Sequence, residues 1–161
     1  MLRYSPLWIV LSLLLGAATA ERPATYVGKC TRVIDGDICW IERQHVTVKV
    51  RLACIDAPEH DQARGKEATA ALSAKLLGKT VRVLPQTIDR YGRTVAQLEV
   101  DGESINRAQV EAGWAHVYTE YIPKKQLAEW LKLQETAKEK HVGVWQDKDP
   151  QRPSDFRKGK K

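Results

Sequence analysis

Residues 46–52 alternate strictly between apolar and polar side chains, and no other segment constrains the fold as tightly. The apolar members are Val46, Val48, Val50 and Leu52, and they alternate with Thr47, Lys49 and Arg51. A period of two predicts a β-strand with one face in the core and Arg51 on the other face. The chain has 161 residues, of which 43% are hydrophobic. It can therefore bury a core as one domain, and its 10 Gly and 7 Pro exclude a collagen-like chain.

Four further segments have strand composition: residues 25–34, 37–42, 80–84 and 94–100. The first two flank Asp35-Gly36, a pair typical of tight hairpin turns in which glycine adopts a positive φ. Apolar residues at helical spacing predict three helices, which end at Gly78, run from a cap at Ser104 to Gly113, and begin at Pro123. This order of strands and helices is of the α+β class, and the compact way to close five short strands is a small barrel. We therefore expect a five-stranded OB-fold β-barrel with three α-helices.

The third helix has an apolar stripe of Leu127, Trp130, Leu131 and Ala137, and we expect this stripe to pack on the core. No internal repeat and no interdomain linker interrupts the chain. We therefore assign residues 21–150 to a single domain.

Residues 1–20 have the pattern of a signal peptide. Arg3 precedes an apolar run at residues 7–17, and Ala18 and Ala20 are small residues at the positions that a signal peptidase reads. An uncleaved membrane anchor is the alternative, but the run is short for a bilayer. We expect a secreted or periplasmic protein with no membrane anchor after cleavage.

Residues 151–161 carry most of the net charge of +6, because five cations there face a single acid. With Pro153 and Gly159, this composition predicts a basic disordered tail. Its role is left open between a solubilising end and an attraction to phosphate backbones that does not depend on base sequence.

Three cysteines, Cys30, Cys39 and Cys54, follow the expected signal peptide. An oxidising compartment allows one disulfide and one free thiol. Each cysteine also lies in an apolar, strand-like run, where cysteine commonly acts as a small buried hydrophobic residue. The sequence selects no pairing among them.

Two pairs of carboxylates stand near predicted strand ends. Asp35 and Asp37 flank the hairpin glycine, and Asp56 and Glu59 lie at the end of the alternating strand, at a corner that Pro58 makes rigid. If both pairs meet at one rim of the barrel, their oxygens would suit a hard cation such as Ca²⁺ or Mg²⁺. The alternative is that each pair is simply solvated.

A third polar segment, Asp89-Arg90-Tyr91-Gly92-Arg93, joins the last two predicted strands. Arginine offers a planar fork of donors that matches phosphate oxygens, and tyrosine adds a stacking face. A basic hairpin loop without function is the alternative. Acids for a metal together with arginines for an anion form a set suited to phosphoryl transfer.

The order Ile34-Asp-Gly-Asp37, Arg51…Asp56-Ala-Pro-Glu59 and Asp89-Arg-Tyr-Gly-Arg93, with Val-Gly-Val-Trp at residues 142–145, resembles the staphylococcal nuclease family. The resemblance extends over residues 26–145. It implies an OB-fold barrel with three helices and a calcium-dependent hydrolase. Such an enzyme cuts DNA and RNA at the 5′ P–O bond, leaves 3′-phosphates and has little sequence specificity.

The resemblance also implies roles for individual residues. Asp37 and Asp56 are similar to the calcium carboxylates. Ala57 occupies the position of a Thr in the founding enzyme; that Thr binds the metal through its backbone carbonyl, so Ala57 should still serve. Glu59 resembles the residue that orients or deprotonates water. The remaining matches are Arg51 and Arg93, as phosphate clamps, and Tyr91, as a nucleotide contact.

Two other functions remain open at this stage. A non-catalytic nucleic-acid-binding OB-fold module would have no need of the full set Asp37, Arg51, Asp56, Glu59 and Arg93. An exported structural domain whose basic tail docks on an anionic envelope would show no activity on nucleic acid. We expect a monomer whose partners are DNA and RNA substrates, and we expect His45, His60, His116 and His141 to have surface or packing roles.

Overall fold

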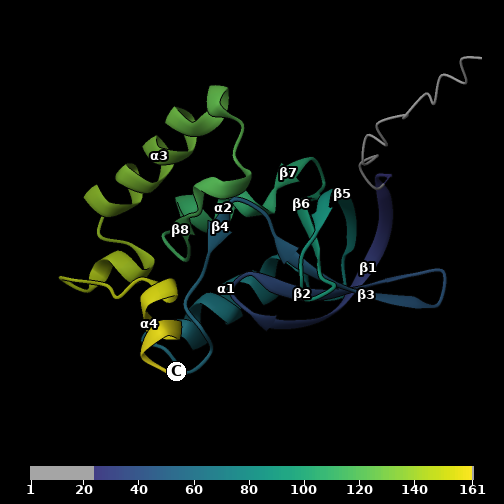
Figure 1. The fold of residues 1–161 in the computed structure, drawn as a ribbon, viewed down its shortest axis with the longest axis horizontal. Coiled ribbons are helices and arrows are strands. Elements are labelled where there is room, and N and C mark those ends of the chain that lie inside the picture. Colours follow the sequence, from purple (N-terminus) through teal and green to yellow (C-terminus); the bar gives the residue numbers. More distant parts are fainter. Residues whose placement is uncertain (1–23, 161) are drawn as a thin grey trace, which may run out of the picture.

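The computed structural model describes residues 24–160, and Figure 1 shows them as a β-barrel flanked by helices. The signal peptide expected at residues 1–20 lies outside the described residues. Within residues 24–160, no helix combines the length and the apolar character needed to cross a membrane.

The barrel consists of five strands, as expected for an OB-fold. They are β1 (Tyr26–Asp35), β2 (Ile38–Arg43), β3 (Val46–Leu52), β5 (Thr80–Ile88) and β6 (Thr94–Val100). Strands β1, β2 and β3 form an antiparallel meander, β5 pairs with both β1 and β6, and a parallel pairing of β3 with β6 closes the barrel. Closure leaves few unpaired edges, which is the physical advantage of this architecture.

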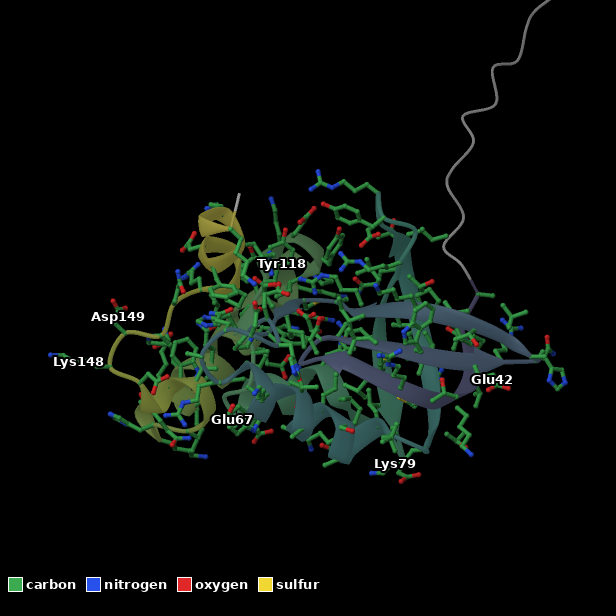
Figure 2. All side chains as sticks on the ribbon, turned by 90° about the horizontal axis from the view of Figure 1, so that it is seen from below. Glu42, Glu67, Lys79, Tyr118, Lys148 and Asp149 are labelled. Atoms are coloured by element: carbon green, nitrogen blue, oxygen red, sulfur yellow. The ribbon has the colours of Figure 1, made fainter. Side chains whose placement is uncertain are left out.

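The apolar residues of β3 differ in burial between the two ends of the strand. Val50 and Leu52 are fully buried, whereas Val46 is exposed. In Figures 1 and 2 the β2–β3 hairpin extends to one end of the molecule, away from the helices α3 and α4. The apolar face of β3 therefore enters the core only where the strand joins the closed part of the barrel, which is also where Arg51 lies.

The three expected helices are present as α1 (Gly65–Leu76), α2 (Ile105–Glu111) and α3 (Lys124–Glu139). The Ser104 side chain caps α2 by accepting a hydrogen bond from the backbone N–H of Arg107, and Gly78 and Gly113 follow helix ends with positive φ, as predicted. The expected apolar stripe of α3 is wrong at Leu131, which is 39% exposed. Gln134 of the same helix is buried instead. Its side chain accepts a hydrogen bond from the backbone N–H of Val117, which satisfies the buried polar group.

Short elements complete the chain. They are β4 (Ile55–Asp56), β7 (Glu103–Ser104), β8 (His116–Val117), two 3₁₀ turns η1 (Thr119–Tyr121) and η2 (Gly143–Gln146), and a fourth helix α4 (Pro153–Gly159). Strands β4 and β8 pair with each other outside the barrel sheet.

The prediction of a disordered tail at residues 151–161 is wrong for the part of this segment that the structure describes. Residues 153–159 form α4, which begins at a proline in the position that favours helix starts. Its Arg157 pairs with Asp56 and Glu59, and this pairing over a long sequence distance stabilises a helix that composition alone disfavours.

Cys30, Cys39 and Cys54 are all free thiols, and all three are buried. The structure thus assigns each of them a place in the core and forms no disulfide among the three. This agrees with the interpretation of cysteine as a small hydrophobic residue.

Two buried polar side chains of α2 connect the helix to the barrel. The side-chain amide of Asn106 donates to the carbonyls of Ala53 (2.8 Å) and Ala96 (3.1 Å), and its Oδ1 accepts from the backbone N–H of Leu98 (2.9 Å). Gln109 Nε2 donates to the carbonyl of Gly36 at 3.2 Å. One short helix thereby holds the turn after β3 and the turn between β1 and β2 in fixed positions.

We predict that Asn106→Ala lowers the free energy of unfolding by about 3 kcal/mol, because it leaves buried backbone groups without partners. Urea unfolding followed by circular dichroism measures this loss. Gln126→Ala, at an exposed position of α3, is the control and should change stability by less than about 0.5 kcal/mol. An equal effect of the two variants would contradict the role assigned to Asn106.

Candidate active site

A cleft of about 940 Å³ opens on one rim of the barrel. Its walls come from the β1–β2 turn, β3, the loop after β4, the β5–β6 hairpin, η1 and α4. The sequence-predicted residues Asp37, Arg51, Glu59, Tyr91 and Arg93 all line it. Segments far apart in the chain therefore place acids and arginines in one concavity.

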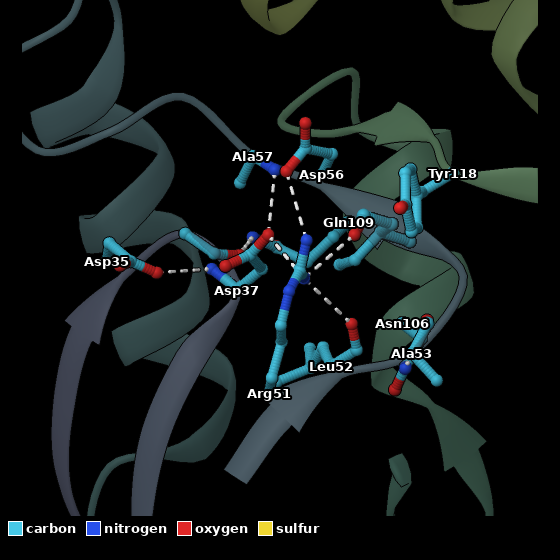
Figure 3. A network of polar contacts seen from close by, with 12 residues as sticks. Asp35, Asp37, Arg51, Leu52, Ala53, Asp56, Ala57, Asn106, Gln109 and Tyr118 are labelled. Atoms are coloured by element: carbon cyan, nitrogen blue, oxygen red, sulfur yellow. Dashed lines mark hydrogen bonds and ion pairs between the residues drawn. The ribbon is translucent and has the colours of Figure 1, made fainter. Parts of the chain in front are cut away.

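Arg51 is the centre of the polar network drawn in Figure 3. Its Nη1 donates to Asp37 Oδ2 at 2.9 Å, and its Nη2 donates to Asp56 Oδ1 at 3.0 Å. Nη1 also reaches the carbonyl of Ile55 at 3.1 Å. The Arg51 side chain is only 13% exposed, so one guanidinium group joins two acids largely out of solvent.

The β1–β2 turn fixes Asp37 through backbone and side-chain contacts. The backbone N–H of Asp37 donates to Asp35 Oδ1 at 3.0 Å, and Asp37 Oδ2 accepts from the N–H of Ala57 at 3.0 Å. Gly36 does not have the positive φ that the Asp-Gly pair predicted. A Cβ atom at Gly36 would lie 2.6 Å from the Cβ of Ala57 and 3.0 Å from that of Ala68, so glycine is required here for close packing.

Asp56 is not at the end of the alternating strand, as the sequence had suggested. Strand β3 ends at Leu52, Cys54 turns the chain with a φ of 69°, and Asp56 lies on β4, opposite His116 of β8. The turn brings Asp56 back over Arg51. His116 is buried and packs edge-on against Trp145 with ring centroids 4.7 Å apart, in agreement with the expected packing role.

The loop that carries Glu59 is folded tightly against the start of α1. The carbonyl of Glu59 accepts the backbone N–H of Gln62 at 2.9 Å, and the carbonyl of Gln62 accepts that of Gly65 at 2.9 Å. A Cβ atom at Gly65 would lie 1.8 Å from the Glu59 carbonyl oxygen. Glycine at this position therefore lets the loop turn closely enough to aim Glu59 at the cleft.

The electrostatics of the rim are dominated by buried acids. The pKa of Asp37 is raised to about 8, and burial is the main cause; Arg51 opposes this shift, while Asp35 and Asp56 add to it. Burial also raises the pKa of Asp35. For Arg51, burial lowers the pKa, but Asp37 and Asp56 outweigh this effect and the net shift is upward. The acids thus favour the approach of further positive charge.

The donor set fits a hard divalent cation. Asp37 and Asp56 are each about 5% exposed and present oxygen atoms, the ligands that calcium prefers. Within residues 24–160, no three His, Cys, Asp or Glu side chains already form a complete metal cage. Two carboxylates, supplemented by backbone carbonyls such as that of Ala57 and by water, are the ligands available to such an ion.

Arg157 of α4 is a site residue that the sequence did not predict. Its Nη1 and Nη2 bind Asp56 Oδ1 and Oδ2, each at 3.1 Å, and Nη1 also binds Glu59 Oε1 at 2.8 Å. The only signals for an ordered segment were a proline at a helix start, Asp155 in the first turn and basic residues in the last turn. These signals predict a helix but do not predict where it docks.

The β5–β6 hairpin brings Arg93 and Tyr91 to the cleft. Asp89 organises the hairpin tip, since its carboxylate accepts the backbone N–H groups of Tyr91 (2.9 Å) and Arg93 (3.0 Å) and the Nε of Arg93 (2.6 Å). Burial raises the pKa of Asp89, but these contacts give a net downward shift. Among the described residues, Arg93 forms no ion pair with Asp37, Asp56 or Glu59. Its guanidinium therefore belongs to the cleft but not to the acid cluster.

Aromatic side chains line the mouth of the cleft. Tyr91 is 67% exposed, and the guanidinium carbons of Arg90 and Arg93 lie 4.9 Å and 5.3 Å from its ring centre. Tyr118 and Tyr121 face the same cavity from η1 and its flank, and the Arg51 guanidinium lies 5.8 Å from the Tyr118 ring. Such faces can stack against the bases of a single strand.

Comparison with known proteins gives a consistent match. Residues 49–147 match the family described as "Staphylococcal nuclease homologue". An "Uncharacterized endonuclease" of Escherichia coli is 38% identical over 127 residues, covering 78% of this chain and 81% of that protein. A "Micrococcal nuclease" of Shigella flexneri is 33% identical over 147 residues, covering 86% and 84%, and an "Uncharacterized endonuclease" of Haemophilus influenzae is 35% identical over 148 residues, covering 91% and 80%.

We predict that Arg51→Met lowers the free energy of unfolding by about 3–5 kcal/mol, because Asp37 and Asp56 lose the charge that compensates their burial. Urea unfolding at neutral pH measures the loss. Adding Asp56→Asn to Arg51→Met should recover part of the stability, because one uncompensated charge is removed. A loss below about 1 kcal/mol, or no recovery in the double variant, would contradict this role of Arg51.

Proposed function

Because this chain belongs to the staphylococcal nuclease family, we propose that it is an exported, calcium-dependent nuclease acting on DNA and RNA. It would hydrolyse phosphodiester bonds with little sequence specificity and leave 3′-phosphates. The observation that carries the proposal is the convergence of Asp37, Arg51, Asp56, Glu59 and Arg93 on one rim. A protein that only bound nucleic acid would need the basic groups but not the buried acids.

The acids of the rim supply the cation site. Asp37 and Asp56, with the backbone carbonyl of Ala57, would hold a calcium ion, whose charge would offset the negative charge that develops on the phosphate. Arg51 already orients both carboxylates. No large rearrangement of the barrel is therefore needed to present these oxygens to the ion.

Glu59 is suited to act on the attacking water. Its side chain is about one-third exposed at the cleft and lies on the loop next to Asp56. Its carboxylate would orient the water and accept a proton as the water oxygen bonds to phosphorus. The bond from phosphorus to the 5′ oxygen then breaks and this oxygen takes up a proton from solvent, so the products are a 3′-phosphate and a 5′-hydroxyl group.

Arg51 and Arg93 face the cleft from β3 and from the β5–β6 hairpin, and each offers a planar set of donors to phosphate oxygens. They would hold the scissile phosphate and stabilise the added negative charge in the transition state. The exposed ring of Tyr91 would contact a neighbouring nucleotide by stacking, which any base can satisfy. This accords with low sequence specificity.

We predict that protein comprising residues 21–161 degrades denatured DNA when calcium is present and stops when a chelator is added. Glu59→Gln or Arg93→Ala should lower kcat by about 10²–10⁴-fold, because each removes a group that acts in the transition state. Gel assays and analysis of the product ends measure both effects.

The matched control variants are Glu42→Gln and Arg82→Ala. Glu42 lies at the opposite end of the molecule from α4 in Figure 2, and Arg82 is exposed on β5. Both controls should retain full activity. Binding of DNA without cleavage by the parent protein would instead support a non-catalytic OB-fold module.

Export is proposed from the pattern of residues 1–20 alone. When the full chain is produced in a bacterial host, the protein recovered from the periplasm or medium should begin at Glu21. Mass spectrometry of the intact protein measures this. Ala18→Asp should block processing, because the peptidase requires a small residue there. A full-length chain that stays in the cytoplasm would refute the proposal.

A further inference from the structure

We propose that α4 is an intramolecular inhibitor of the cation site, in which the Arg157 guanidinium competes with the divalent cation for Asp56 and Glu59. The inference rests on the proposed function, since it concerns the same acids. Figure 1 shows α4 at the C-terminal end of the described chain, beside the loop that leads from β4 to α1. That loop carries Glu59.

The contacts of Arg157 occupy the atoms that a metal ion would need. Both oxygens of Asp56 accept from the Arg157 fork at 3.1 Å, and Oδ1 also accepts from Arg51 at 3.0 Å. Glu59 Oε1 accepts from Arg157 at 2.8 Å. A cation bound to the Asp56 oxygens would meet this guanidinium at close range. The two positive groups therefore exclude one another.

Arg157 can neutralise the acids but cannot perform the proposed role of a calcium ion. It provides one positive charge and only hydrogen-bond donors, so it leaves no position for a phosphate oxygen or a water oxygen to be bound as a ligand. It also keeps Glu59 in an ion pair, which withholds the carboxylate from water. The docked helix thus blocks two of the proposed catalytic functions at once.

The attachment of α4 is weak enough to be reversed. The helix has seven residues, and a helix of this length is unstable in water without tertiary contacts. Its anchors are the buried Pro153, a hydrogen bond from Gln62 Nε2 to the Gln151 carbonyl (2.7 Å), and an ion pair between Lys160 and Asp61. These contacts are mostly polar, and Arg157 itself is about 43% exposed, so a divalent cation can displace the helix.

The chain offers a matched control within the same helix. Lys158 lies next to Arg157, but its Nζ pairs with Asp155 of α4 itself at 2.9 Å and its side chain is mostly exposed. Arg157→Ala and Lys158→Ala remove the same charge from the same segment. Any difference between the two variants therefore reports on the contact with Asp56 and Glu59, and not on the net charge of the protein.

The first measurement is calcium binding by isothermal titration calorimetry on protein comprising residues 21–161. If α4 is docked about 90% of the time, Arg157→Ala should bind calcium about tenfold more tightly than the parent protein. Lys158→Ala should bind with unchanged affinity. Equal affinities in all three proteins would overturn the inference and leave the proposed function standing.

The second measurement is hydrogen–deuterium exchange of the peptide that covers residues 153–160. Calcium should increase exchange in the parent protein, because the released helix unfolds. In Arg157→Ala, exchange should be fast even without calcium. Protection that calcium does not change would contradict displacement of α4.

Two further outcomes separate the inference from the function on which it rests. If no protein binds calcium and none cleaves DNA, the proposed function fails and the inference fails with it. If Arg157→Ala binds calcium more weakly, or cleaves DNA more slowly at saturating calcium, then Arg157 belongs to the working site, and the inhibitory role is wrong.

Discussion

Everything at the rim depends on the pairing of Arg51 with two buried carboxylates. Asp37 comes from the β1–β2 turn and Asp56 from β4, and a single guanidinium group binds both. Without that charge the two acids would be buried without a compensating partner, and the contact between the turn and β4 would lose stability. The same pairing leaves the acids outnumbering the nearby cations of the barrel. The excess of acids in this ion-pair network therefore favours the binding of a further cation.

The parts of the site differ in how firmly they are held. The β1–β2 turn that carries Asp37 and the turn that leads to Asp56 on β4 rest on α2 through the buried amides of Asn106 and Gln109, so they belong to the core of the domain. The β5–β6 hairpin is organised by its own Asp89 and stands at the edge. Helix α4 is held by a few polar contacts at the surface. The acids are therefore the most firmly held part of the site, and α4, which lies over them, is the least firmly held part.

Much of the fold followed from local patterns. Alternation in residues 46–52 predicted β3, and Ser104, Gly78 and Gly113 predicted helix boundaries, because strand period and helix capping act over a few residues. Predictions failed where tertiary packing overrides local preference. Gly36 serves close packing and not a positive φ, and Leu131 is exposed on α3. Asp56 lies on a separate short strand because Cys54 turns the chain before it.

The sequence by itself determined the five strands of the barrel, the three main helices and the family motifs that single out the acids and arginines. Only the tertiary structure decided which charges meet. Arg51 and Asp37 are fourteen residues apart, whereas Arg157 and Asp56 are 101 residues apart. Local periodicity carries no information on pairs so distant, since their contact depends on how barrel closure and helix packing bring the segments together. For that reason a segment with the composition of a disordered tail is instead a helix bound over the candidate active site.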